Sequence, residues 1–504
     1  MRVVAIRLVA IVGFALGAGN PAAAHNGRWE PPQIHPAAVS LDAILARIRT
    51  AAGTPLPAYD ARIEHWSLRA GGATLPVIVT VRGADLRFDT VIDGATYTQG
   101  RNAGNRWRRT PNGLVRLIGA DVQGDDLDRW PLASFPFDAA DCAALGEASV
   151  GRTAAWVVEY RPAHDSPHWF YVDESSGRIV REVFREGSRN VTFDFTDVRT
   201  VDGANRPFAW HVSGAGGDAD VAIERIDPQS VQPAAVAIPA SLAPVTVFDA
   251  NPVAVPAVFE GDRIRVNAIV NGRPGTFLFD TGTTQILLDE EAARRFGLQP
   301  VLGHAVVHEF RTGAITFHDV AVQTVPLAGF RADGILGYDY FLGHVVHVDF
   351  VRQKLQLIAS ETFVPPPDAY QIAANFDEAM PVVAARIGNA SSSRVVLDTG
   401  SWNALVLRDF YDSDPAVLRR MGIGVVGRTH PEPFLEGTID AASATVATIE
   451  FAGTRFVNDD IEVQVREGRD DVDFPIDAIF GTQLLDKFEW WFDYDDGRIW
   501  LRRN

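Results

Sequence analysis

Two aspartates in matching contexts could form a proton-sharing pair. Asp280 follows an apolar run in FLFDTG (277–282), and Asp398 does the same in VVLDTG (395–400). Two Asp side chains held about 3 Å apart cannot both ionise, so such a pair keeps one proton over a wide pH range. The ionised member can deprotonate a water while the protonated member donates to a carbonyl oxygen. These are the two proton movements that hydrolysis of a peptide bond requires.

The residues after each aspartate suit a tight loop that presents a carboxylate. Each Asp stands where a strand-like apolar run meets Thr-Gly, and glycine lets backbone approach a substrate closely. Hydroxyl groups can bond across or within the loops, and Thr283 and Ser401 place one three residues after each Asp, where it could hold the carboxylate. The predicted site therefore has Asp280 and Asp398 as catalytic residues, supported by Thr281, Gly282, Thr283, Thr399, Gly400 and Ser401.

The sequence around the two triplets repeats, which separates them from ordinary turns. A lone Asp-Thr-Gly mostly marks a loop, whereas an internal repeat indicates duplicated structural units. DGILG (333–337) follows the first triplet and DAIFG (477–481) follows the second. The copies then stay in step, matching Phe341 with Leu485, Val346 with Trp490, Val348 with Phe492, Asp349 with Asp493, Phe350 with Tyr494 and Leu357 with Leu501. Residues from about 258 to 360 and from about 378 to 504 therefore read as two copies of one unit.

The chain resembles the aspartic proteases of the retropepsin and pepsin clan. The resemblance rests on the apolar-apolar-Asp-Thr-Gly-Thr/Ser loop and the downstream apolar-apolar-Gly, and it covers roughly the last half of the sequence. It implies that each copy is a small closed β-barrel lobe, closer to a single retropepsin unit than to a full pepsin lobe. It also implies that one Asp from each lobe faces a shared water. Because both copies lie in one chain, a monomer would build the complete site.

Turn and helix signals place matching elements in the two copies. Asn-Gly at 271–272 and Gly-Asn at 388–389 indicate hairpins ahead of the two aspartates. A short helix is predicted at 290–296, after Asp289, and its counterpart begins at 414–415 and ends before Gly422.

The copies differ most between the triplet and the second glycine motif. Asp280 and Gly337 are 57 residues apart, while Asp398 and Gly481 are 83 residues apart. Members of the clan carry a mobile hairpin flap in this interval. The longer second interval, which includes RTHPEP (428–433), fits either an extended flap or specificity loop, or a longer surface excursion.

The N-terminus has the pattern of a secretory signal peptide. Arg2 and Arg7 precede an apolar stretch at 8–18, which PAAA (21–24) follows. A charged start, a short apolar core and a small-residue cleavage site are typical of such a peptide. The core is shorter than an ordinary membrane span, so an uncleaved anchor is the less favoured alternative. We expect residues 1–24 to be removed, leaving a periplasmic or secreted chain with no integral membrane segment.

Composition indicates a large protein without disulfides. Of the 504 residues, 47% are hydrophobic, which is enough for two or three cores. The net charge of −18 becomes −20 without Arg2 and Arg7, which disfavours nucleic acids and anionic membranes as partners. Cys142 is the only cysteine, so no internal disulfide can form and a buried thiol is expected.

Three further patterns are interpreted as structural. GIGVVG (422–427) matches a dinucleotide-binding pattern, but it follows a predicted helix and leads to a loop with proline, which indicates a turn. His304 and His308 have metal-like spacing, yet their alternating context is that of a strand, which holds them apart along one face. His344 and His347 fall where the other copy has aromatic residues, which favours packing. No cofactor or metal is therefore predicted.

Residues 25–245 are predicted to form an antiparallel, β-rich N-terminal domain. A helix is expected at 41–52, strands at 75–81, 154–160, 169–172, 179–184 and 191–195, and a turn at 174–178. The stretch 171–208 faintly resembles periplasmic half-barrel proteins of the lipoprotein-carrier type. Such a domain could bind an apolar ligand, sort substrates or cover a protease cleft, and the sequence leaves these alternatives open. The Pro/Ala-rich stretch 228–244 reads as a linker.

The predicted architecture is mainly β, with two tandem retropepsin-like acid-protease β-barrel lobes, at 250–362 and 370–504, behind the N-terminal domain. The leading hypothesis is an exported aspartic endopeptidase that acts as a monomer on peptide or protein substrates. In it, Asp280 and Asp398 activate a shared water. The competing hypothesis is a non-catalytic periplasmic protein that binds peptides or other ligands on a protease-like fold. A carrier whose N-terminal domain does the main work is a third.

Overall fold

The computed structural model describes residues 34–504 with interruptions. The residues left out within this range are 36–38, 54–60, 119–138, 162–166, 187–188, 202, 215–217, 242–245, 249–250, 261–262, 328, 377–378, 412–413, 435–436 and 466–475. The predicted signal peptide at 1–24 lies outside the described residues. No helix among the described residues has the length and apolar character needed to cross a membrane.

The structure is mainly β, as predicted, and its chain divides into two compact units. Unit 1 takes the described residues within Met1–Arg108, Leu117–Ala240 and Val301–Gly303, and unit 2 takes those within Arg109–Arg116, Ser241–Pro300 and His304–Asn504. The short segment Arg109–Arg116 therefore belongs to unit 2, although the chain on both sides of it belongs to unit 1.

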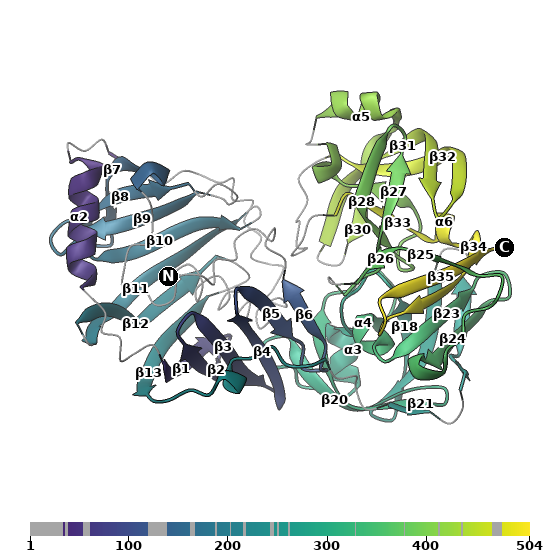
Figure 1. Ribbon diagram of the computed structural model, residues 1–504, viewed down its shortest axis with the longest axis horizontal. Coiled ribbons are helices and arrows are strands. Elements are labelled where there is room, and N and C mark those ends of the chain that lie inside the picture. Colours follow the sequence, from purple (N-terminus) through teal and green to yellow (C-terminus); the bar gives the residue numbers. More distant parts are fainter. Residues whose placement is uncertain are drawn as a thin grey trace. The chain divides into compact units, whose positions relative to one another are not determined.

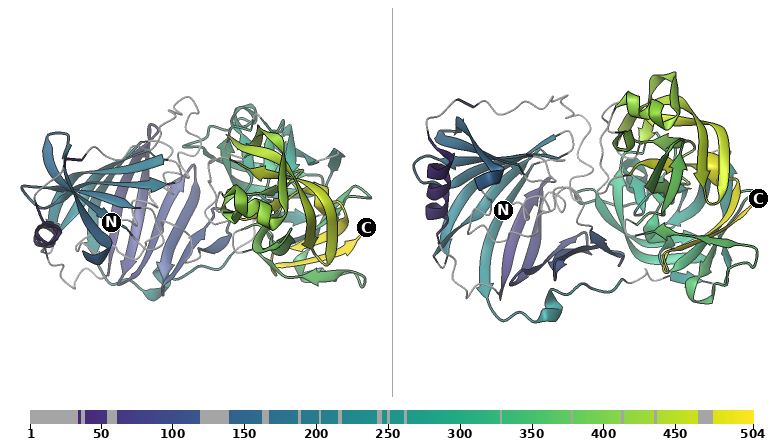
Figure 2. Two further views of the ribbon diagram at one scale, coloured as in Figure 1. Left: turned by 90° about the horizontal axis from the view of Figure 1, so that it is seen from above. Right: turned by 45° about the horizontal axis from the view of Figure 1, so that its top comes forward.

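Unit 1 is built on one antiparallel sheet of 13 strands, in the order β6-β5-β4-β3-β2-β1-β13-β12-β11-β10-β9-β8-β7. The strands are β1 (Ala61–Ala70), β2 (Ala73–Arg82), β3 (Asp85–Ile92), β4 (Ala95–Asn102), β5 (Asn105–Arg109), β6 (Val115–Ile118), β7 (Cys142–Val150), β8 (Thr153–Tyr160), β9 (His168–Asp173), β10 (Ile179–Glu186), β11 (Arg189–Val201), β12 (Ala204–Ser213) and β13 (Ala219–Pro228). Figures 1 and 2 show one continuous curved surface. The antiparallel, β-rich N-terminal prediction is confirmed.

Helix α2 (Leu41–Ala52) covers the β7–β9 end of this sheet (Figure 1). Ser40 caps its first turn, because the Ser40 hydroxyl accepts from a backbone N–H of that turn. Ile44, Leu45 and Ile48 fall on one face of the helix and are buried against β8 and β9, where they meet Phe170. The helix has the predicted bounds because its capping residue and apolar spacing agree.

Unit 2 contains two lobes and a sheet that joins them. Lobe 1 runs from β14 to β24 and lobe 2 from β25 to β35. The lobe 1 sheet has the order β14-β21-β19-β22-β18-β17-β16, with β20 paired to β17 and β21. The lobe 2 sheet has the order β26-β27-β28-β33-β29-β32-β31-β30, and β27 also pairs with β31. The joining sheet has the order β15-β24-β23-β34-β35-β25 and mixes strands of both lobes (Figure 1).

The bounds of these elements are as follows. Lobe 1 contains β14 (Thr246–Phe248), β15 (Val253–Ala254), β16 (Ala257–Glu260), β17 (Arg263–Val270), β18 (Arg273–Phe279), β19 (Leu287–Asp289), α3 (Glu290–Arg295), β20 (His304–Thr312), β21 (Ile315–Val325), β22 (Gly334–Leu336), α4 (Tyr338–Phe341), β23 (His344–Asp349) and β24 (Lys354–Ala359). Lobe 2 contains β25 (Tyr370–Ile372), β26 (Ala374–Asn375), β27 (Val382–Ile387), β28 (Ala390–Leu397), β29 (Ala404–Val406), α5 (Pro415–Met421), β30 (Ile423–Phe434), β31 (Gly437–Phe451), β32 (Thr454–Gln464), β33 (Ala478–Phe480), α6 (Thr482–Leu485), β34 (Phe488–Asp493) and β35 (Arg498–Arg503). The 3-10 turns are η4 (Ala139–Asp141), η5 (Pro233–Ala235), η6 (Ser360–Thr362) and η7 (Arg408–Tyr411).

The two short helices of the repeat form at the predicted places. The Asp289 carboxylate caps α3, and the Asp414 carboxylate caps α5. Helix α5 ends at Gly422, whose φ of 82° is the left-handed conformation that glycine adopts without strain. GIGVVG (422–427) is therefore a helix end that leads into a strand, as expected from the sequence.

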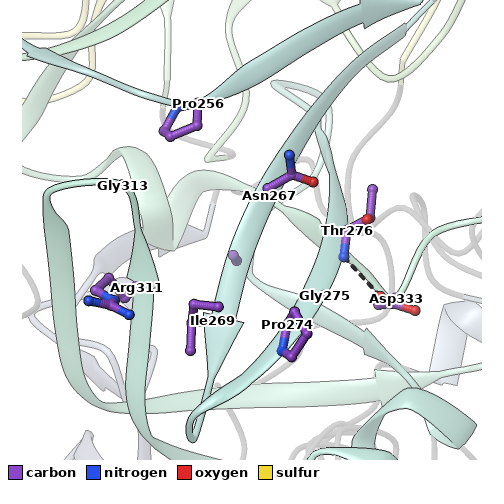
Figure 3. Close-up of a pocket in the computed structure, with 10 residues that line it drawn as sticks. Pro256, Asn267, Ile269, Pro274, Gly275, Thr276, Arg311, Gly313 and Asp333 are labelled. Atoms are coloured by element: carbon purple, nitrogen blue, oxygen red, sulfur yellow. Dashed lines mark hydrogen bonds between the residues drawn. The ribbon is translucent and has the colours of Figure 1, made fainter.

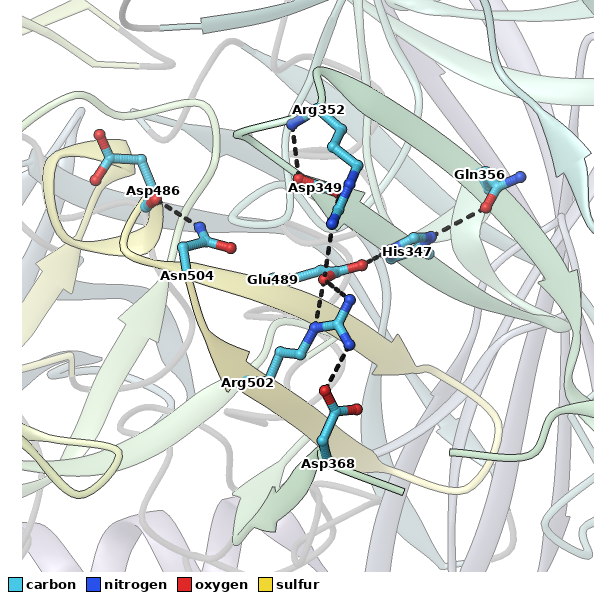
Figure 4. Close-up of polar contacts among 9 residues, drawn as sticks. All are labelled: His347, Asp349, Arg352, Gln356, Asp368, Asp486, Glu489, Arg502 and Asn504. Carbon is cyan, nitrogen blue, oxygen red and sulfur yellow. Dashed lines mark hydrogen bonds and ion pairs between the residues drawn. The ribbon is translucent and has the colours of Figure 1, made fainter. Parts of the chain in front are cut away.

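Strands β23 and β34 pair so that the two copies of the repeat are related by a twofold rotation. His347 lies opposite Trp491, its own counterpart in the other copy, and their rings stack at 4.8 Å. The Glu489 carboxylate forms a hydrogen bond with the His347 imidazole at 2.7 Å and an ion pair with the Arg502 guanidinium at 2.6 Å (Figure 4). Arg502 also bonds Asp368 at 2.7 Å. This network ties strands of both lobes into one sheet.

One buried apolar cluster runs through both lobes. Its aromatic members include Phe279, which stands directly before Asp280, and Phe341, whose ring centroids are 4.9 Å apart. Phe341 also contacts Tyr494 of lobe 2 at 5.0 Å. Because close-packed interiors resist displacement, the strands that lead into both aspartates have fixed positions.

Candidate active site

Each aspartate extends a strand that is paired in parallel with the strand of the second glycine motif. In lobe 1, β18 pairs with β22, and the Asp280 N–H donates to the Leu336 carbonyl at 3.0 Å. In lobe 2, β28 pairs with β33, and the Asp398 N–H donates to the Phe480 carbonyl at 3.0 Å. In each lobe, the strand of the second glycine motif therefore holds the backbone of the Asp-Thr-Gly triplet by hydrogen bonds.

The two Asp-Thr-Gly loops bind each other through their threonines. The Thr281 N–H donates to the Thr399 hydroxyl, and the Thr399 N–H donates to the Thr281 hydroxyl, both at 3.1 Å. The hydroxyls in turn donate across the loops, from Thr281 to the Leu397 carbonyl at 2.7 Å and from Thr399 to the Phe279 carbonyl at 2.9 Å. Four buried hydrogen bonds thus lock the loops into a symmetric pair.

The glycines allow the carboxyl of each loop to approach the backbone of the other. A Cβ atom at Gly282 would lie 2.6 Å from the Asp398 carboxyl carbon. A Cβ atom at Gly400 would lie 2.4 Å from the Asp280 carboxyl carbon. Because real Cβ atoms do not approach other atoms this closely, only glycine permits the observed facing of the two aspartates.

Both carboxyls accept hydrogen bonds from their own loops, with one difference. Asp280 accepts from the Gly282 N–H and from the Thr283 hydroxyl, both at 2.7 Å. Asp398 accepts from the Gly400 N–H at 2.7 Å and from the Ser401 N–H at 3.2 Å.

The Ser401 hydroxyl departs from the expectation that it holds the adjacent carboxylate. It donates to the Asn403 carbonyl at 3.3 Å. The Ser401 N–H shares Oδ1 of Asp398 with the Gly400 N–H, whereas the Thr283 hydroxyl bonds the other oxygen, Oδ2, of Asp280.

The electrostatics of the pair place a proton on Asp398. Burial, followed by the charge of Asp280 and a hydrogen bond with it, raises the pKa of Asp398 well above its usual range. Asp398 can then donate to Asp280 across the pair. Asp398 therefore keeps its proton at pH values where an isolated Asp is ionised.

Two further aspartates support the strands that carry the pair. Asp333 accepts from the Thr276 N–H of β18 at 2.8 Å, and Asp477 accepts from the Ser392 hydroxyl of β28 at 2.6 Å. Both open the second glycine motif, in DGILG and DAIFG. Their repetition in the sequence was the signal that could have identified them as supports of the site.

A pocket of about 460 Å³ on lobe 1 is separate from the dyad (Figure 3). Its lining includes Asn267, Arg311 and Asp333, and neither Asp280 nor Asp398 contributes to it. Asp333 is already engaged by Thr276 within this pocket and by Arg295 at 2.6 Å. Among the described residues, no group of three or more His, Cys, Asp or Glu side chains could hold a metal ion.

The longer interval of lobe 2 forms an extended hairpin. Strands β30 and β31 pair along their length, and β31 continues into the pairing with β32. The structure therefore favours an extended hairpin over an irregular surface excursion. His430 on β30 lies 3.6 Å from Glu462 and 3.8 Å from Glu432. Partial burial, together with the charge of Glu462, raises the pKa of Glu432.

The comparisons with known proteins are weak. The family model described as "Aspartyl protease" matches residues 266–305, which include Asp280 and its loop. No curated protein matches the chain. An aspartic proteinase from Irpex lacteus is 13% identical, covers 50% of this chain and 97% of its own, and has a TM-score of 0.31.

Two other solved structures are similar over a smaller part of the chain. A LolA superfamily protein from Nitrosomonas europaea is 14% identical, covers 40% of this chain and 98% of its own, and has a TM-score of 0.30. A DUF1329 family protein from Desulfovibrio piger is 15% identical, covers 37% of this chain and 91% of its own, and has a TM-score of 0.28. Only the match of the family model to residues 266–305 suggests a relationship to aspartyl proteases.

Proposed function

We propose that this protein is an exported aspartic endopeptidase whose dyad is Asp280 and Asp398. The observation that carries the proposal is the reciprocal locking of the two Asp-Thr-Gly loops, which sets two buried carboxyls face to face. A ligand-binding cleft would not need both carboxyls, both glycines and the crossed threonine hydrogen bonds. A hydrolase needs them, because the proton shared by the pair is the reagent of the reaction.

The observed contacts support one assignment of the two proton transfers. Asp280, steadied by the Thr283 hydroxyl and the Gly282 N–H, takes a proton from the attacking water. Asp398, protonated at the start, gives its proton to the oxygen of the scissile carbonyl as the water oxygen bonds to the carbon. The resulting diol collapses when Asp398 takes back a hydroxyl proton and Asp280 protonates the leaving nitrogen. The dyad thereby returns to its starting state.

The compartment and substrate follow from the sequence. The signal-peptide pattern at 1–24 supports export to the periplasm or the medium. Both aspartates belong to one chain, which supports activity as a monomer on peptide or protein substrates. Glu432 on β30 and Glu462 on β32 place two acidic side chains beside His430 in lobe 2.

Digestion of a peptide library between pH 3 and pH 8 tests the proposal. We expect cleavage that a statine-type transition-state mimic blocks, and no cleavage by Asp280→Asn or Asp398→Asn. Asp319→Asn is the matched control, because Asp319 is an exposed lobe 1 aspartate outside the dyad. Binding of peptides without cleavage at any pH would favour the binding-protein hypothesis. Cleavage that survives both dyad substitutions would contradict the proposed chemistry.

A further inference from the structure

A second buried carboxyl lies next to the loop of Asp280. Asp339 stands in α4, two residues after Gly337, and only 1% of its surface is exposed. The Ile286 N–H and the Thr110 hydroxyl lie close enough to this carboxyl to favour its ionised form. The carboxyl accepts from the Asn112 amide at 2.7 Å. The dyad mechanism does not use Asp339, so its burial requires another explanation.

Asn112 reaches Asp339 from a segment far away in sequence. The segment Arg109–Arg116 belongs to unit 2, and its Leu114 is buried in the apolar core of the lobes. The Asn112 side chain makes three hydrogen bonds in this unit. Besides bonding Asp339, its amide nitrogen donates to the Ala321 carbonyl at 2.8 Å, and its oxygen accepts from the Ala321 N–H at 2.8 Å.

Lobe 2 satisfies the equivalent positions with one side chain. Gln483 occupies the place of Asp339, since both stand two residues after the second glycine motif. Its oxygen accepts from the Ala404 N–H at 3.4 Å, and its nitrogen donates to the Asp460 carbonyl at 2.9 Å.

The groups that Gln483 contacts in lobe 2 are the counterparts of the groups that Asp339 and Asn112 contact in lobe 1. Ala404 follows Asp398 by six residues, as Ile286 follows Asp280. Strand pairing also matches Asp460 with Ala321. In lobe 1 the short strand after the triplet, β19, pairs with Gln323, and in lobe 2 the equivalent strand, β29, pairs with Glu462. Ala321 and Asp460 each lie two residues before these paired residues. Asp339 and Asn112 together therefore span what Gln483 spans alone.

We propose that Asn112 is a positioning residue for the Asp280 loop. Asn112 bonds Asp339, and the two side chains together fix in lobe 1 the groups that Gln483 fixes alone in lobe 2. The inference rests on the proposed peptidase activity and deepens it. It means that the complete lobe 1 site includes a residue from the first quarter of the sequence.

The anchor acts at the end of the loop that carries the catalytic carboxyl. The Asp339 carboxyl lies beside the Ile286 N–H at the end of this loop, and the neighbouring Tyr338 N–H donates to the Thr283 carbonyl at 2.9 Å. Thr283 is the residue whose hydroxyl holds Asp280. Loss of the Asn112 amide leaves the buried Asp339 carboxyl without the hydrogen bond that Asn112 donates, so Asp339 and the loop beside it shift.

The first test separates kcat from KM in the full-length protein. We expect Asn112→Ala to lower kcat about 10-fold and to change KM by less than about 2-fold, because small misplacements of reacting groups cost rate. Asn251→Ala is the matched control, because Asn251 also makes two-ended hydrogen bonds to lobe 1, with Thr362 and Ala359, away from the loop. An unchanged kcat in Asn112→Ala overturns the proposal.

The second test uses lobe 2 as the template for rescue. In the Asn112→Ala background, Asp339→Gln supplies the amide from the position of Gln483, and we expect it to restore kcat to within about 3-fold of the wild type. A merely structural loss in the Asn112 segment would not be repaired by a change at Asp339. A double variant no better than Asn112→Ala overturns the proposal.

Hydrogen exchange measures positioning without any substrate. In Asn112→Ala, peptides that cover 280–290 should exchange at least about 5-fold faster, while peptides that cover 398–408 should be unchanged. Equal exchange in both loops overturns the positioning role. If the wild-type protein cleaves no peptide, the proposed function fails, and the exchange result still decides whether Asn112 anchors the loop.

Discussion

The two lobes are equivalent at the dyad and differ around it. Both place an Asp after a strand, hold its N–H with the strand of the second glycine motif, and cross-link through a threonine. Their outer parts diverge, because lobe 2 adds the β30–β31 hairpin and lobe 1 takes in the segment Arg109–Arg116. The shared part is the one that proton sharing requires, and the divergent parts lie where geometry tolerates variation.

The lobes also differ in how they treat equivalent polar groups. Thr283 bonds Asp280 through its hydroxyl, while Ser401 bonds Asp398 through its backbone. In lobe 1, Asp339 and Asn112 together make the contacts whose counterparts Gln483 makes alone in lobe 2. A near-twofold frame can therefore give its two carboxyls different surroundings, because small contacts around each of them differ.

The largest expected effect breaks the dyad itself. Asp280→Asn and Asp398→Asn should each lower kcat/KM by at least about 1,000-fold, because each removes one of the two proton transfers. Circular dichroism and size-exclusion chromatography should show folded protein in both cases. A variant that keeps more than a tenth of the wild-type activity would show that the lobes do not act as a pair.

The next effect tests the close approach of the loops. Gly282→Ala and Gly400→Ala should each lower kcat about 100-fold, because the new Cβ would push the opposite carboxyl aside. Gly424→Ala on β30 is the control, since its Cβ would lie 3.6 Å from the nearest side-chain atom. Strongly unequal effects of the two active-site substitutions would argue against a symmetric dyad.

The pH dependence of stability should expose the buried carboxyl of lobe 1. Burial raises the pKa of Asp339 to about 7. The unfolded chain releases this proton near pH 4, whereas the folded protein keeps it up to about pH 7, so the free energy of unfolding falls as pH rises between these values. Urea denaturation at pH 4.5 and 7.5 should show a loss of roughly 2–3 kcal/mol from this group. Asp339→Gln should remove that part of the slope, and an unchanged slope would contradict the assignment.

The smallest effect measures the difference between the two loop hydroxyls. Thr283→Ala should lower kcat about 10-fold, because it removes a charge-assisted hydrogen bond to Asp280. Ser401→Ala should change kcat by less than about 2-fold, because the serine hydroxyl points to Asn403. Equal losses in steady-state assays would mean that the two loops hold their carboxyls alike.

Much of the local structure could be predicted because local signals agreed with one another. Helices α2 and α5 follow capping residues and apolar spacing, and hairpins form where Asn-Gly and Gly-Asn occur. The repeat identified the second glycine motif as a matching part of both copies, and the structure then showed that its strand pairs with the strand of each triplet. The mainly β architecture, with an antiparallel N-terminal sheet and later barrel-like sheets, follows from these strand signals.

Other features depend on groups that meet only after folding. Nothing around Asn112 in the sequence indicates that its amide bonds Asp339, more than 200 positions away. The direction of the Ser401 hydroxyl depends on a carbonyl in its own folded loop. Which aspartate has the raised pKa depends on burial and on the charge of its partner, and identical triplets cannot encode that difference.

The sequence by itself determined that two equivalent carboxyls exist, which strands lead into them, and which glycines and threonines accompany them. These are properties of short motifs, and a short motif can be recognised in a sequence when it occurs twice. Only the tertiary structure decided that the loops cross-link, that Asp398 holds the proton, and that Asn112 completes lobe 1. The physical reason is that proton affinity and loop position depend on distances between groups that the chain brings together from remote positions.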